Sequence, residues 1–313
     1  MGSEEGLNGP LQEVLVHGHK IDIQIVTGSN VPVCSFLGPN GTFSEQAAKQ
    51  LLVDQVIFQE QSSNSQVVET AGMGGADLAV VAVENSSDSF VNEATRKLFE
   101  SPNLSVLAEE ILPIEQTLFG RPDASAVLRS HEKAIGQCRG WIARNLPGVQ
   151  IITHPSTSEA IAMAAKNNEM AIGCAVAADL YAIPIIQEGI EDIKGNATRF
   201  WLLGRGETQP TGEDATATFF SLPDIPGSLS EAFACFGKRG INISAPTLFP
   251  TGSLDQYIFL TTFDGHAKDE EVMWALRELE DICFKVRVLG SYKKIKPIRA
   301  YSRSLVQEGW LGQ

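Results

Sequence analysis

The sequence predicts a mixed α/β fold built from two kinds of unit. From about residue 31, apolar runs of strand length alternate with amphipathic helical runs, an order typical of sheets covered by helices. From residue 216 the expected order is strand, helix, strand, strand, helix, strand, which is that of a ferredoxin-like domain. With 313 residues, of which 43% are hydrophobic, the chain can build two or three domains with separate cores.

Residues 1–32 are expected to form an N-terminal extension. Gly, Ser, Asn and acidic residues surround one alternating run at 14–26, for which we expect a single strand. His17 and His19 have strand spacing, but without a third ligand nearby they are much more typical of surface residues than of a metal site.

A glycine loop precedes a helix in the first β-α-β unit. A strand at 33–37 leads through Gly38-Pro-Asn-Gly41 to a helix that Thr42 opens, and Thr42 and Glu45 have the spacing of a capping box. A helix N-terminus at such a loop can receive a carboxylate, although an ordinary strand-to-helix turn has the same pattern.

Polar residues stand at the carboxyl end of the next strand, expected at 76–83 after a helix at 64–72. The glycines between them form a turn rather than a dinucleotide fingerprint, because Asp77 takes the place of the third glycine and a helix precedes the motif. Open α/β sheets present ligand groups at the carboxyl ends of strands, so Asn85 and Ser86 are candidate ligand residues.

Helices and strands continue to alternate to residue 181. Ser130 is expected to be the N-cap of a helix that contains Gln137, and purely capping or solvent-facing roles suit these two residues as well as ligand roles do. The further elements are a strand at 149–153, a helix at 159–166 capped by Ser156-Thr157-Ser158, a strand at 170–174 and a helix at 175–181.

Thr198-Arg199-Phe200 opens a strand that should be buried on both faces. The apolar run at 200–203 shows no solvent-facing alternation, so its backbone is expected to be rigid. A hydroxyl and a fixed cation at the edge of such a strand suit the grip and protonation of a small anion, although a solvated turn can carry the same tripeptide.

Composition excludes several classes of function. A net charge of -14 repels nucleic acid and anionic membranes, and no apolar run approaches the roughly 20 residues of a membrane span. The five cysteines show no Cys-x-x-Cys spacing, which predicts reduced thiols in a cytoplasmic protein, with no disulfide and no zinc. No nucleophile elbow is present, and Glu191-Asp192 is interpreted as a solvated pair rather than an acid/base couple.

A linker at 208–215 precedes the C-terminal unit. Its strands are expected at 217–222, 241–248, 256–263 and 283–289, with a turn at 251–253. Two apolar stripes mark its helices: Leu229, Ala232, Phe233 and Phe236 in the first, and Val272, Leu276 and Leu279 in the second.

Eight motifs in one order resemble the prephenate dehydratase family with a C-terminal ACT domain. In the first 200 residues they are Phe36-Leu-Gly-Pro-Asn-Gly-Thr-Phe-Ser-Glu-Gln-Ala-Ala48, Val83-Glu-Asn-Ser86, Ser130-His131 with Gln137-Cys138, Ser156-Thr157 and Asn196-Ala-Thr-Arg-Phe200. In the tail they are Pro226-Gly-Ser-Leu229, Arg239-Gly-Ile-Asn242 and Val288-Leu-Gly-Ser-Tyr292. The resemblance covers residues 33–293.

This resemblance implies a catalytic region of two α/β lobes, like a type II periplasmic-binding protein, with the active site between them. Lobe one takes residues 33–111 and 188–207, lobe two takes 112–187, the ACT domain takes 216–294, and 295–313 form a tail. Members of the family convert prephenate to phenylpyruvate in phenylalanine biosynthesis and need no cofactor. A homodimer or homotetramer is expected, because ACT domains commonly pair.

The resemblance also assigns roles to individual residues. Thr198 is the general acid that helps the C4 hydroxyl depart, and Arg199 offsets substrate carboxylate charge. The remaining substrate contacts are Thr42, Asn85, Ser86, Ser130, Gln137, Ser156, Thr157 and Phe200, and an amino acid effector would meet Pro226, Gly227, Ser228, Leu229 and Asn242.

The chain departs from the family pattern at several places. Ser89 and Ala182 stand where glycine is usual, and Gly227-Ser-Leu229 replaces Gly-Ala-Leu. Thr247-Leu-Phe-Pro250 replaces Glu-Ser-Arg-Pro, which removes two charged partners of a zwitterion and predicts a weak or altered phenylalanine response. An arogenate dehydratase, a prephenate decarboxylase and a non-catalytic amino acid sensor are the alternatives, and the presence of Thr198 argues against the decarboxylase.

Overall fold

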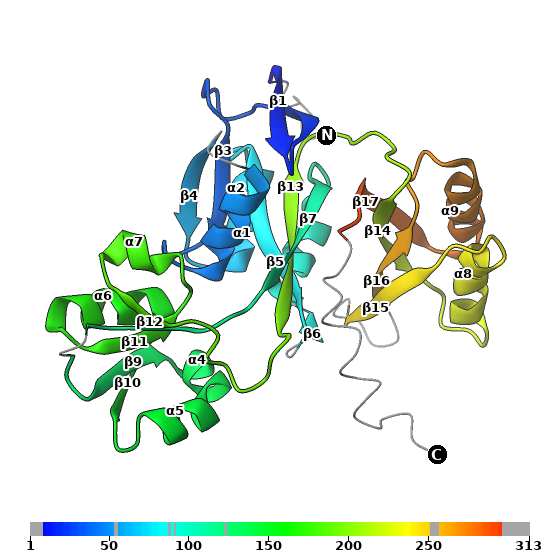
Figure 1. Ribbon diagram of the computed structural model, residues 1–313. Coiled ribbons are helices and arrows are strands. Elements are labelled where there is room, and N and C mark those ends of the chain that lie inside the picture. Colours follow the sequence, from blue (N-terminus) through cyan, green and yellow to red (C-terminus); the bar gives the residue numbers. More distant parts are fainter. Residues whose placement is uncertain are drawn as a thin grey trace, which may run out of the picture.

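The computed structural model describes residues 9–52, 56–86, 89–90, 92–121, 124–250 and 257–295. These residues form two α/β lobes and a C-terminal domain that lies beside the first lobe (Figure 1). The predicted α/β class and the two-lobed architecture are confirmed. Within the described residues, none of the helices has the length and apolar character needed to cross a membrane.

Lobe one is a sheet in the order β4-β3-β5-β13-β7, with β6 paired to β5. Its strands are β3 (Val33–Leu37), β4 (Ile57–Gln61), β5 (Leu78–Asn85), β6 (Ser89–Phe90), β7 (Ser105–Pro113) and β13 (Ala197–Gly204). Its helices are α1 (Phe43–Leu52), α2 (Asn64–Gly72) and α3 (Asn92–Phe99). Strand β13 returns from far along the chain and lies antiparallel between β5 and β7.

Burial on both faces of β13 confirms the expectation from its apolar run. Phe200 and Leu202 belong to one buried cluster, whereas Trp201 and Leu203 belong to another on the opposite face. A strand that pairs with a neighbour on each edge and is covered on both faces holds its backbone firmly, so the residues at its start are well placed to carry a site.

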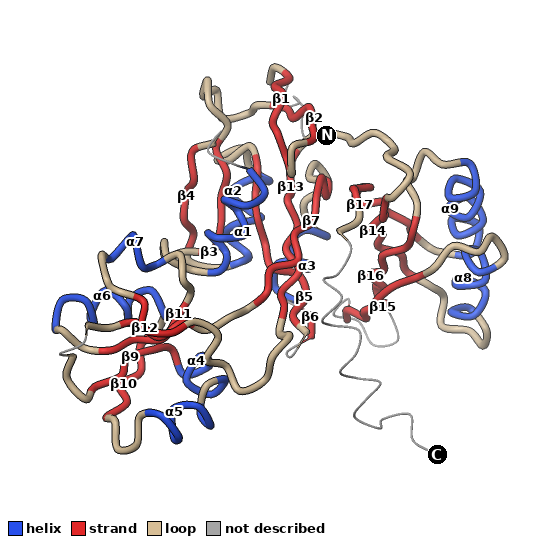
Figure 2. The backbone as a smooth tube through the Cα atoms, viewed as in Figure 1, coloured by secondary structure: helices blue, strands red, loops and turns tan. Residues whose placement is uncertain are grey.

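Lobe two has the strand order β10-β9-β11-β8-β12. Its strands are β8 (Thr117–Phe119), β9 (Val127–His131), β10 (Gln150–His154), β11 (Met170–Gly173) and β12 (Ile185–Gln187), and its helices are α4 (Glu132–Gln137), α5 (Arg139–Asn145), α6 (Thr157–Asn167) and α7 (Ala177–Tyr181). Two loops, drawn tan in Figure 2, join the lobes, and the Ile114 amide donates to the Asn196 carbonyl between them (2.8 Å).

The N-terminal extension folds as a hairpin, so the prediction of a single strand was wrong. Strands β1 (Leu11–Val16) and β2 (His19–Gln24) pair antiparallel around a His17-Gly18 turn, in which both residues have positive φ. Ile23 and Val16 are buried in the core of lobe one. The buried carboxylate of Asp77 fixes the following loop by accepting from the amides of Val26 (2.6 Å) and Val33 (2.8 Å).

The C-terminal domain has the ferredoxin-like order predicted for it. It consists of β14 (Asp214–Ser221), α8 (Ser228–Gly237), β15 (Ile243–Pro250), β16 (Tyr257–Asp264), α9 (Glu270–Ile282) and β17 (Lys285–Lys293), with an antiparallel sheet in the order β15-β16-β14-β17. The predicted turn at 251–253 lies outside the described residues.

One face of this sheet carries the two helices and the other face packs on lobe one (Figure 1). Leu229 is 39% exposed, so the predicted stripe of α8 is wrong at its first position. The buried stripe is formed by Ala232, Cys235 and Phe236, and the predicted Phe233 packs against it. At the seam with lobe one, a Cβ on Gly290 would stand 2.2 Å from the Val106 carbonyl oxygen, so only glycine permits this approach.

Candidate active site

Thr198 stands at the start of β13, where Asn85 of β5 faces it. Thr198 is 7% exposed, and its Oγ1 accepts a hydrogen bond from Asn85 Nδ2 (2.8 Å). The same amide donates to the Ala197 carbonyl (3.2 Å). Because a hydroxyl carries one proton and Asn85 occupies an acceptor position, the Thr198 proton is directed to another acceptor.

A β-bulge in the pairing of β5 with β13 lies next to Asn85 and Thr198. On β5, Glu84 pairs with Arg199 but Ala82 pairs with Phe200, so Val83 is the extra residue. Bulges of this kind are common beside active sites, because they bend a strand and redirect a side chain.

Ser86 fastens the loop after β5 to the residue before Thr198. Its Oγ accepts from the Ala197 amide (3.0 Å) and donates to Asn196 Oδ1 (3.0 Å), and its own amide donates to the Ala197 carbonyl (2.9 Å). The structure therefore brings Asn85, Ser86 and Thr198 together, from segments more than 100 residues apart in sequence.

Arg199 faces the opposite side of the sheet from Thr198, because successive residues of a strand alternate. Its Nε donates to Glu84 Oε2 (3.0 Å) and its Nη1 donates to Glu109 Oε2. Burial acts to lower the pKa of Arg199, but Glu109, Tyr292 and Glu84 outweigh it and hold the pKa above its usual value. The direct substrate contact predicted for Arg199 stays a prediction, and the contacts present are with two carboxylates.

Phe200 returns to the Thr198 face but is 2% exposed and packs in the core of lobe one. Its role in this structure is to anchor β13 just after Thr198.

The start of α1 differs in part from the predicted capping box. Thr42 Oγ1 accepts from the Glu45 amide (3.4 Å) and donates to the Leu37 carbonyl (3.2 Å). The Glu45 carboxylate accepts from the Gly41 amide (2.5 Å), one residue earlier than expected. In a capping box the Glu45 carboxylate would accept from the amide of Thr42, but here it accepts from the amide of Gly41 in the glycine loop.

The start of α6 meets this loop across the boundary between the lobes. Ser156 is the N-cap of α6, as predicted, and Thr157 is its first residue. Ser158 Oγ bonds the Asn40 carbonyl and lies 2.7 Å from the Tyr181 hydroxyl, while Cys174 Sγ donates to Gln46 Oε1 (3.0 Å). The N-termini of α1 and α6 therefore approach one another from opposite lobes, and both favour negative charge.

Ser130 and Gln137 are placed elsewhere in lobe two. Ser130 is fully buried in β9 and donates to the Ile172 carbonyl (2.7 Å), so the prediction that it caps a helix was wrong. His131 is the N-cap, through Nδ1 and the Lys133 amide (3.2 Å). Gln137 Oε1 accepts from Gln116 Nε2 (2.9 Å), which places it in the network that holds the crossover loops.

Glu191 belongs to that network too, so its interpretation as a solvated charge was wrong. It is 7% exposed, and its carboxylate accepts from the Gln116 amide (2.8 Å) and from Lys194 Nζ (2.7 Å). Asp192 accepts from the Gly140 amide (2.6 Å). Neither carboxylate is directed to Thr198 by these contacts, and the sequence pattern held no signal for their structural role.

The predicted effector residues lie at the two ends of α8. Pro226, Gly227, Ser228 and Leu229 stand at its start, and Asn242 follows its end. A helix of 10 residues separates these ends by about 15 Å, so one copy of the chain does not bring them together. Phe249 is 9% exposed and packs with Phe219 against lobe one (ring centroids 6.4 Å apart), in the strand segment that departs from the family pattern.

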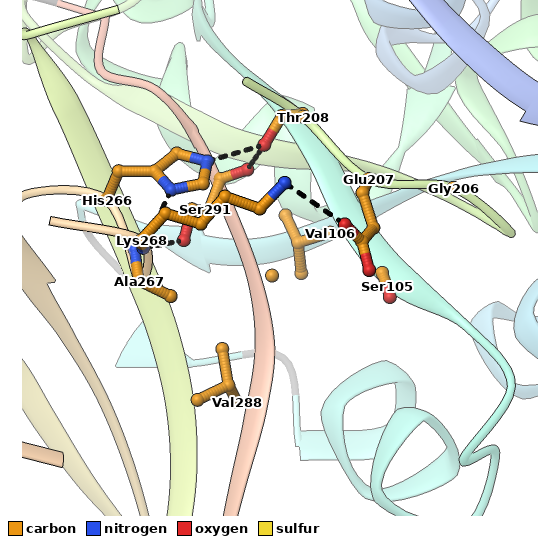
Figure 3. A pocket seen from close by; sticks show the side chains of 11 residues that line it. Ser105, Val106, Gly206, Glu207, Thr208, His266, Ala267, Lys268, Val288 and Ser291 are labelled. Atoms are coloured by element: carbon orange, nitrogen blue, oxygen red, sulfur yellow. Dashed lines mark hydrogen bonds and ion pairs between the residues drawn. The ribbon is translucent and has the colours of Figure 1, made fainter. Parts of the chain in front are cut away.

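A cavity of about 210 Å³ lies in the seam between lobe one and the C-terminal domain (Figure 3). Its polar groups bond one another: Lys268 Nζ with Glu207 Oε2 (3.1 Å), and His266 Nε2 with Thr208 Oγ1 (3.2 Å). Gly206 lines it beyond the far end of β13, so the cavity is separate from the site at Thr198.

No cluster of three or more His, Cys, Asp or Glu side chains with metal-site geometry occurs in the described part of the chain. The site around Thr198 consists of hydroxyl, amide and backbone groups, which suit positioning and proton donation to an anion.

The fold and this site define a two-lobed α/β protein in which Asn85, Ser86 and Thr198 form a polar cluster at the start of a buried strand. The family model for prephenate dehydratase matches residues 34–208, and the chain belongs to the prephenate dehydratase family.

Relatives at the sequence level cover most of the chain. A bifunctional chorismate mutase/prephenate dehydratase of Aquifex aeolicus is 32% identical over 289 residues, which are 90% of this chain and 80% of that protein. A prephenate dehydratase of Lactococcus lactis subsp. lactis is 32% identical over 270 residues, 82% of this chain and 96% of that protein.

Solved structures of similar fold also cover most of the chain. The prephenate dehydratase of Arthrobacter aurescens in complex with L-Phe superposes with a TM-score of 0.76, at 29% identity, over 88% of this chain and 96% of that one. GqqA, described as a novel type of quorum quenching acylase, also gives a TM-score of 0.76, at 26% identity, over 85% of this chain and 99% of that one.

Proposed function

We propose that this chain is a prephenate dehydratase, which converts prephenate to phenylpyruvate, carbon dioxide and water. The hydrogen bond from Asn85 to Thr198 Oγ1 carries the proposal, because it leaves the threonine proton available for a departing oxygen. Membership of the family supports the reaction, and the placement of Thr198 at a rigid strand end supports its role.

Little covalent chemistry is required of the protein. As the ring carboxylate leaves as carbon dioxide, its bonding electrons complete the aromatic ring and the C4–O bond breaks. The departing oxygen takes a proton from Thr198 and leaves as water, and the threonine regains a proton from solvent. A threonine hydroxyl is a weak acid, so proton donation is concerted with C–O cleavage and depends on close positioning.

The carboxylates of the substrate need positive potential that the net charge of the protein does not supply. The facing N-termini of α1 and α6 offer backbone amides at Thr42, Ser156 and Thr157. Asn85 and Ser86 orient the reacting part of the molecule at the start of β13. Arg199, Ser130 and Gln137 then act by holding the strands and crossover loops that carry these groups.

Product analysis separates the alternatives. Purified protein is incubated with prephenate and, separately, with arogenate, and products are identified by ultraviolet absorbance and mass. The proposal expects phenylpyruvate from prephenate at the higher kcat/KM. Phenylalanine from arogenate at a higher kcat/KM indicates an arogenate dehydratase, a product that retains the hydroxyl indicates a decarboxylase, and binding without turnover indicates a sensor.

An amino acid effector is proposed for the C-terminal domain. The A. aurescens relative was solved with L-Phe, which supports phenylalanine as the ligand class. Since the predicted effector residues lie at opposite ends of α8, a shared site needs two copies of the chain, as a homodimer or homotetramer. Phe249 lies within the segment where the family carries charged residues, so we expect weak phenylalanine binding, and calorimetry that shows tight binding would contradict this.

The predicted location in the cytoplasm rests on the cysteine pattern, and a metabolic enzyme of this family suits it.

A further inference from the structure

The buried carboxylate of Glu109 joins the catalytic strand to the end of the C-terminal domain. Glu109 lies on β7 and is 1% exposed. One of its oxygens accepts from Arg199 Nη1, next to Thr198, and the other accepts from the amide of Ile295 (2.8 Å). Ile295 comes two residues after the end of β17, so a single side chain connects the two domains.

Arg199 extends this connection to both neighbours of β13. It binds Glu84 on β5 and Glu109 on β7, and these strands flank β13 in the sheet. Glu84 immediately precedes Asn85, whose amide holds Thr198. A guanidinium between two carboxylates has fixed directions for its hydrogen bonds, so it sets the start of β13 relative to the end of β5 and the middle of β7.

Aromatic and backbone contacts join β17 to lobe one, and β17 leads directly to Ile295, so a movement of the C-terminal domain also moves Ile295. Tyr292 is 1% exposed, and its ring centroid lies 6.3 Å from that of Trp201 on β13. The Gly290 backbone lies against Val106 of β7. From the other side, His17 of the N-terminal hairpin bonds the Glu109 carbonyl (3.1 Å), which fixes the backbone of this residue as well.

We propose that Glu109 is a positioning residue for the reaction, acting through Arg199 and controlled by the Ile295 amide. This inference rests on the proposed role of Thr198. When the C-terminal domain holds Ile295 in place, both oxygens of Glu109 have donors and Arg199 is fixed. When the amide is withdrawn, a buried carboxylate loses a donor, and the Glu109-Arg199 pair shifts to recover it. A displacement of about 1 Å at Thr198 is enough to reduce turnover strongly.

The test compares two substitutions at one position. Ile295→Pro removes the amide proton, whereas Ile295→Ala keeps it and removes only the side chain. We expect Ile295→Pro to lower kcat with prephenate about 10-fold relative to Ile295→Ala, with KM changed less than about twofold. Glu109→Gln, which keeps the size of the side chain and removes its charge, is expected to lower kcat similarly.

Two controls separate positioning from loss of fold. Circular dichroism and Tm show whether the Pro variant folds, and kcat is measured again in an osmolyte that favours the folded state. A merely destabilised enzyme regains activity there, whereas a mispositioned one does not. Should Ile295→Pro fail to fold, Glu109→Gln decides the matter by the same two readouts.

Equal kcat values for Ile295→Pro and Ile295→Ala would overturn the inference, as would a Glu109→Gln enzyme of unchanged kcat. Failure of the proposed function has a different signature, since the unaltered protein then forms no phenylpyruvate from prephenate.

Discussion

Asn85 determines the hydrogen bonding of the Thr198 hydroxyl. Its amide donates to Thr198 Oγ1, and the Ala197 carbonyl takes a second bond from the same amide, which fixes the plane of the Asn85 side chain. The hydroxyl proton is therefore not used in the bond with Asn85. The contacts of Thr198 thus distinguish it from an ordinary buried threonine, whose proton would be donated to a backbone carbonyl.

At the same scale, Glu110 provides a pH-dependent prediction. Burial, and to a smaller extent Glu109, raise the pKa of this carboxyl above its usual value, although His17 and the Ile111 amide oppose the shift. A raised carboxyl pKa makes the folded state most favourable below the unfolded pKa of about 4.3, and this stability is lost as pH rises through the folded pKa. Glu110→Gln should therefore raise Tm by a few degrees more at pH 8 than at pH 4, and calorimetric scans giving equal changes at the two values would contradict this.

The ends of buried strands were enough to make Asn85 and Ser86 candidate residues, because open α/β sheets present polar groups there, whereas the role predicted for Thr198 came from the resemblance to the family. The direction of Arg199 was not predictable in this way. It depends on the bulge at Val83 and on carboxylates from β5 and β7, which are distant in sequence. Ser130 was misplaced because no strand was expected before the helix, whereas β9 runs through Ser130 to His131.

The C-terminal end of helix α3 is capped by a side chain of the C-terminal domain. Arg287 of β17 donates from Nη1 to the carbonyls of Leu98 (2.9 Å) and Phe99 (3.1 Å), and from Nη2 to those of Ser101 (2.8 Å) and Leu104 (3.0 Å). The last carbonyls of a helix have no partners within it, so the guanidinium serves as a C-cap. Its burial lowers the pKa of Arg287 relative to the usual value.

Arg287→Ala should lower the free energy of unfolding by about 2 kcal/mol, because several carbonyls lose a charged donor. Arg287→Lys is the matched comparison, since it keeps the charge but lacks the fork that reaches four acceptors. We expect it to recover less than half of the loss in urea unfolding. Full recovery by lysine would show that charge alone, and not the geometry of the cap, matters here.

Most elements were predictable from periodicity, as the C-terminal domain shows. The N-terminal hairpin was not, since its turn consists of His17, with an unusual positive φ, and a single glycine. Such a turn is difficult to separate from a continuous alternating strand until Ile23 and Val16 are seen to share one core.

The whole molecule depends on the return of β13 into lobe one after the chain has built lobe two. This places Thr198 beside Asn85 and at the same time creates a boundary where the Gly38–Gly41 loop meets α6 and α7. No local pattern predicts such an exchange, because strand pairing across more than 100 residues is set by tertiary packing.

A substitution at Gly41 tests the contact between the two lobes, because Gly41 lies against residues of lobe two. It has φ +87°, and a Cβ there would stand 2.9 Å from Ser158 Oγ and 3.2 Å from Ala177 Cβ. Gly41→Ala should raise KM for prephenate about 10-fold by holding the lobes apart. Gly212→Ala is the control, because φ is +83° but nothing lies within 4 Å, so it adds similar backbone strain without a contact. Equal KM values for the two variants would contradict this reading of the boundary.

The most direct test of the account is the turnover of Thr198→Ala against Thr198→Ser, with prephenate as substrate and phenylpyruvate followed by absorbance. Alanine removes the proton donor, whereas serine retains a hydroxyl within reach of Asn85. We expect kcat to fall about 100-fold or more for alanine and to recover to at least a tenth of the original value for serine. Near-normal phenylpyruvate formation by Thr198→Ala would contradict it.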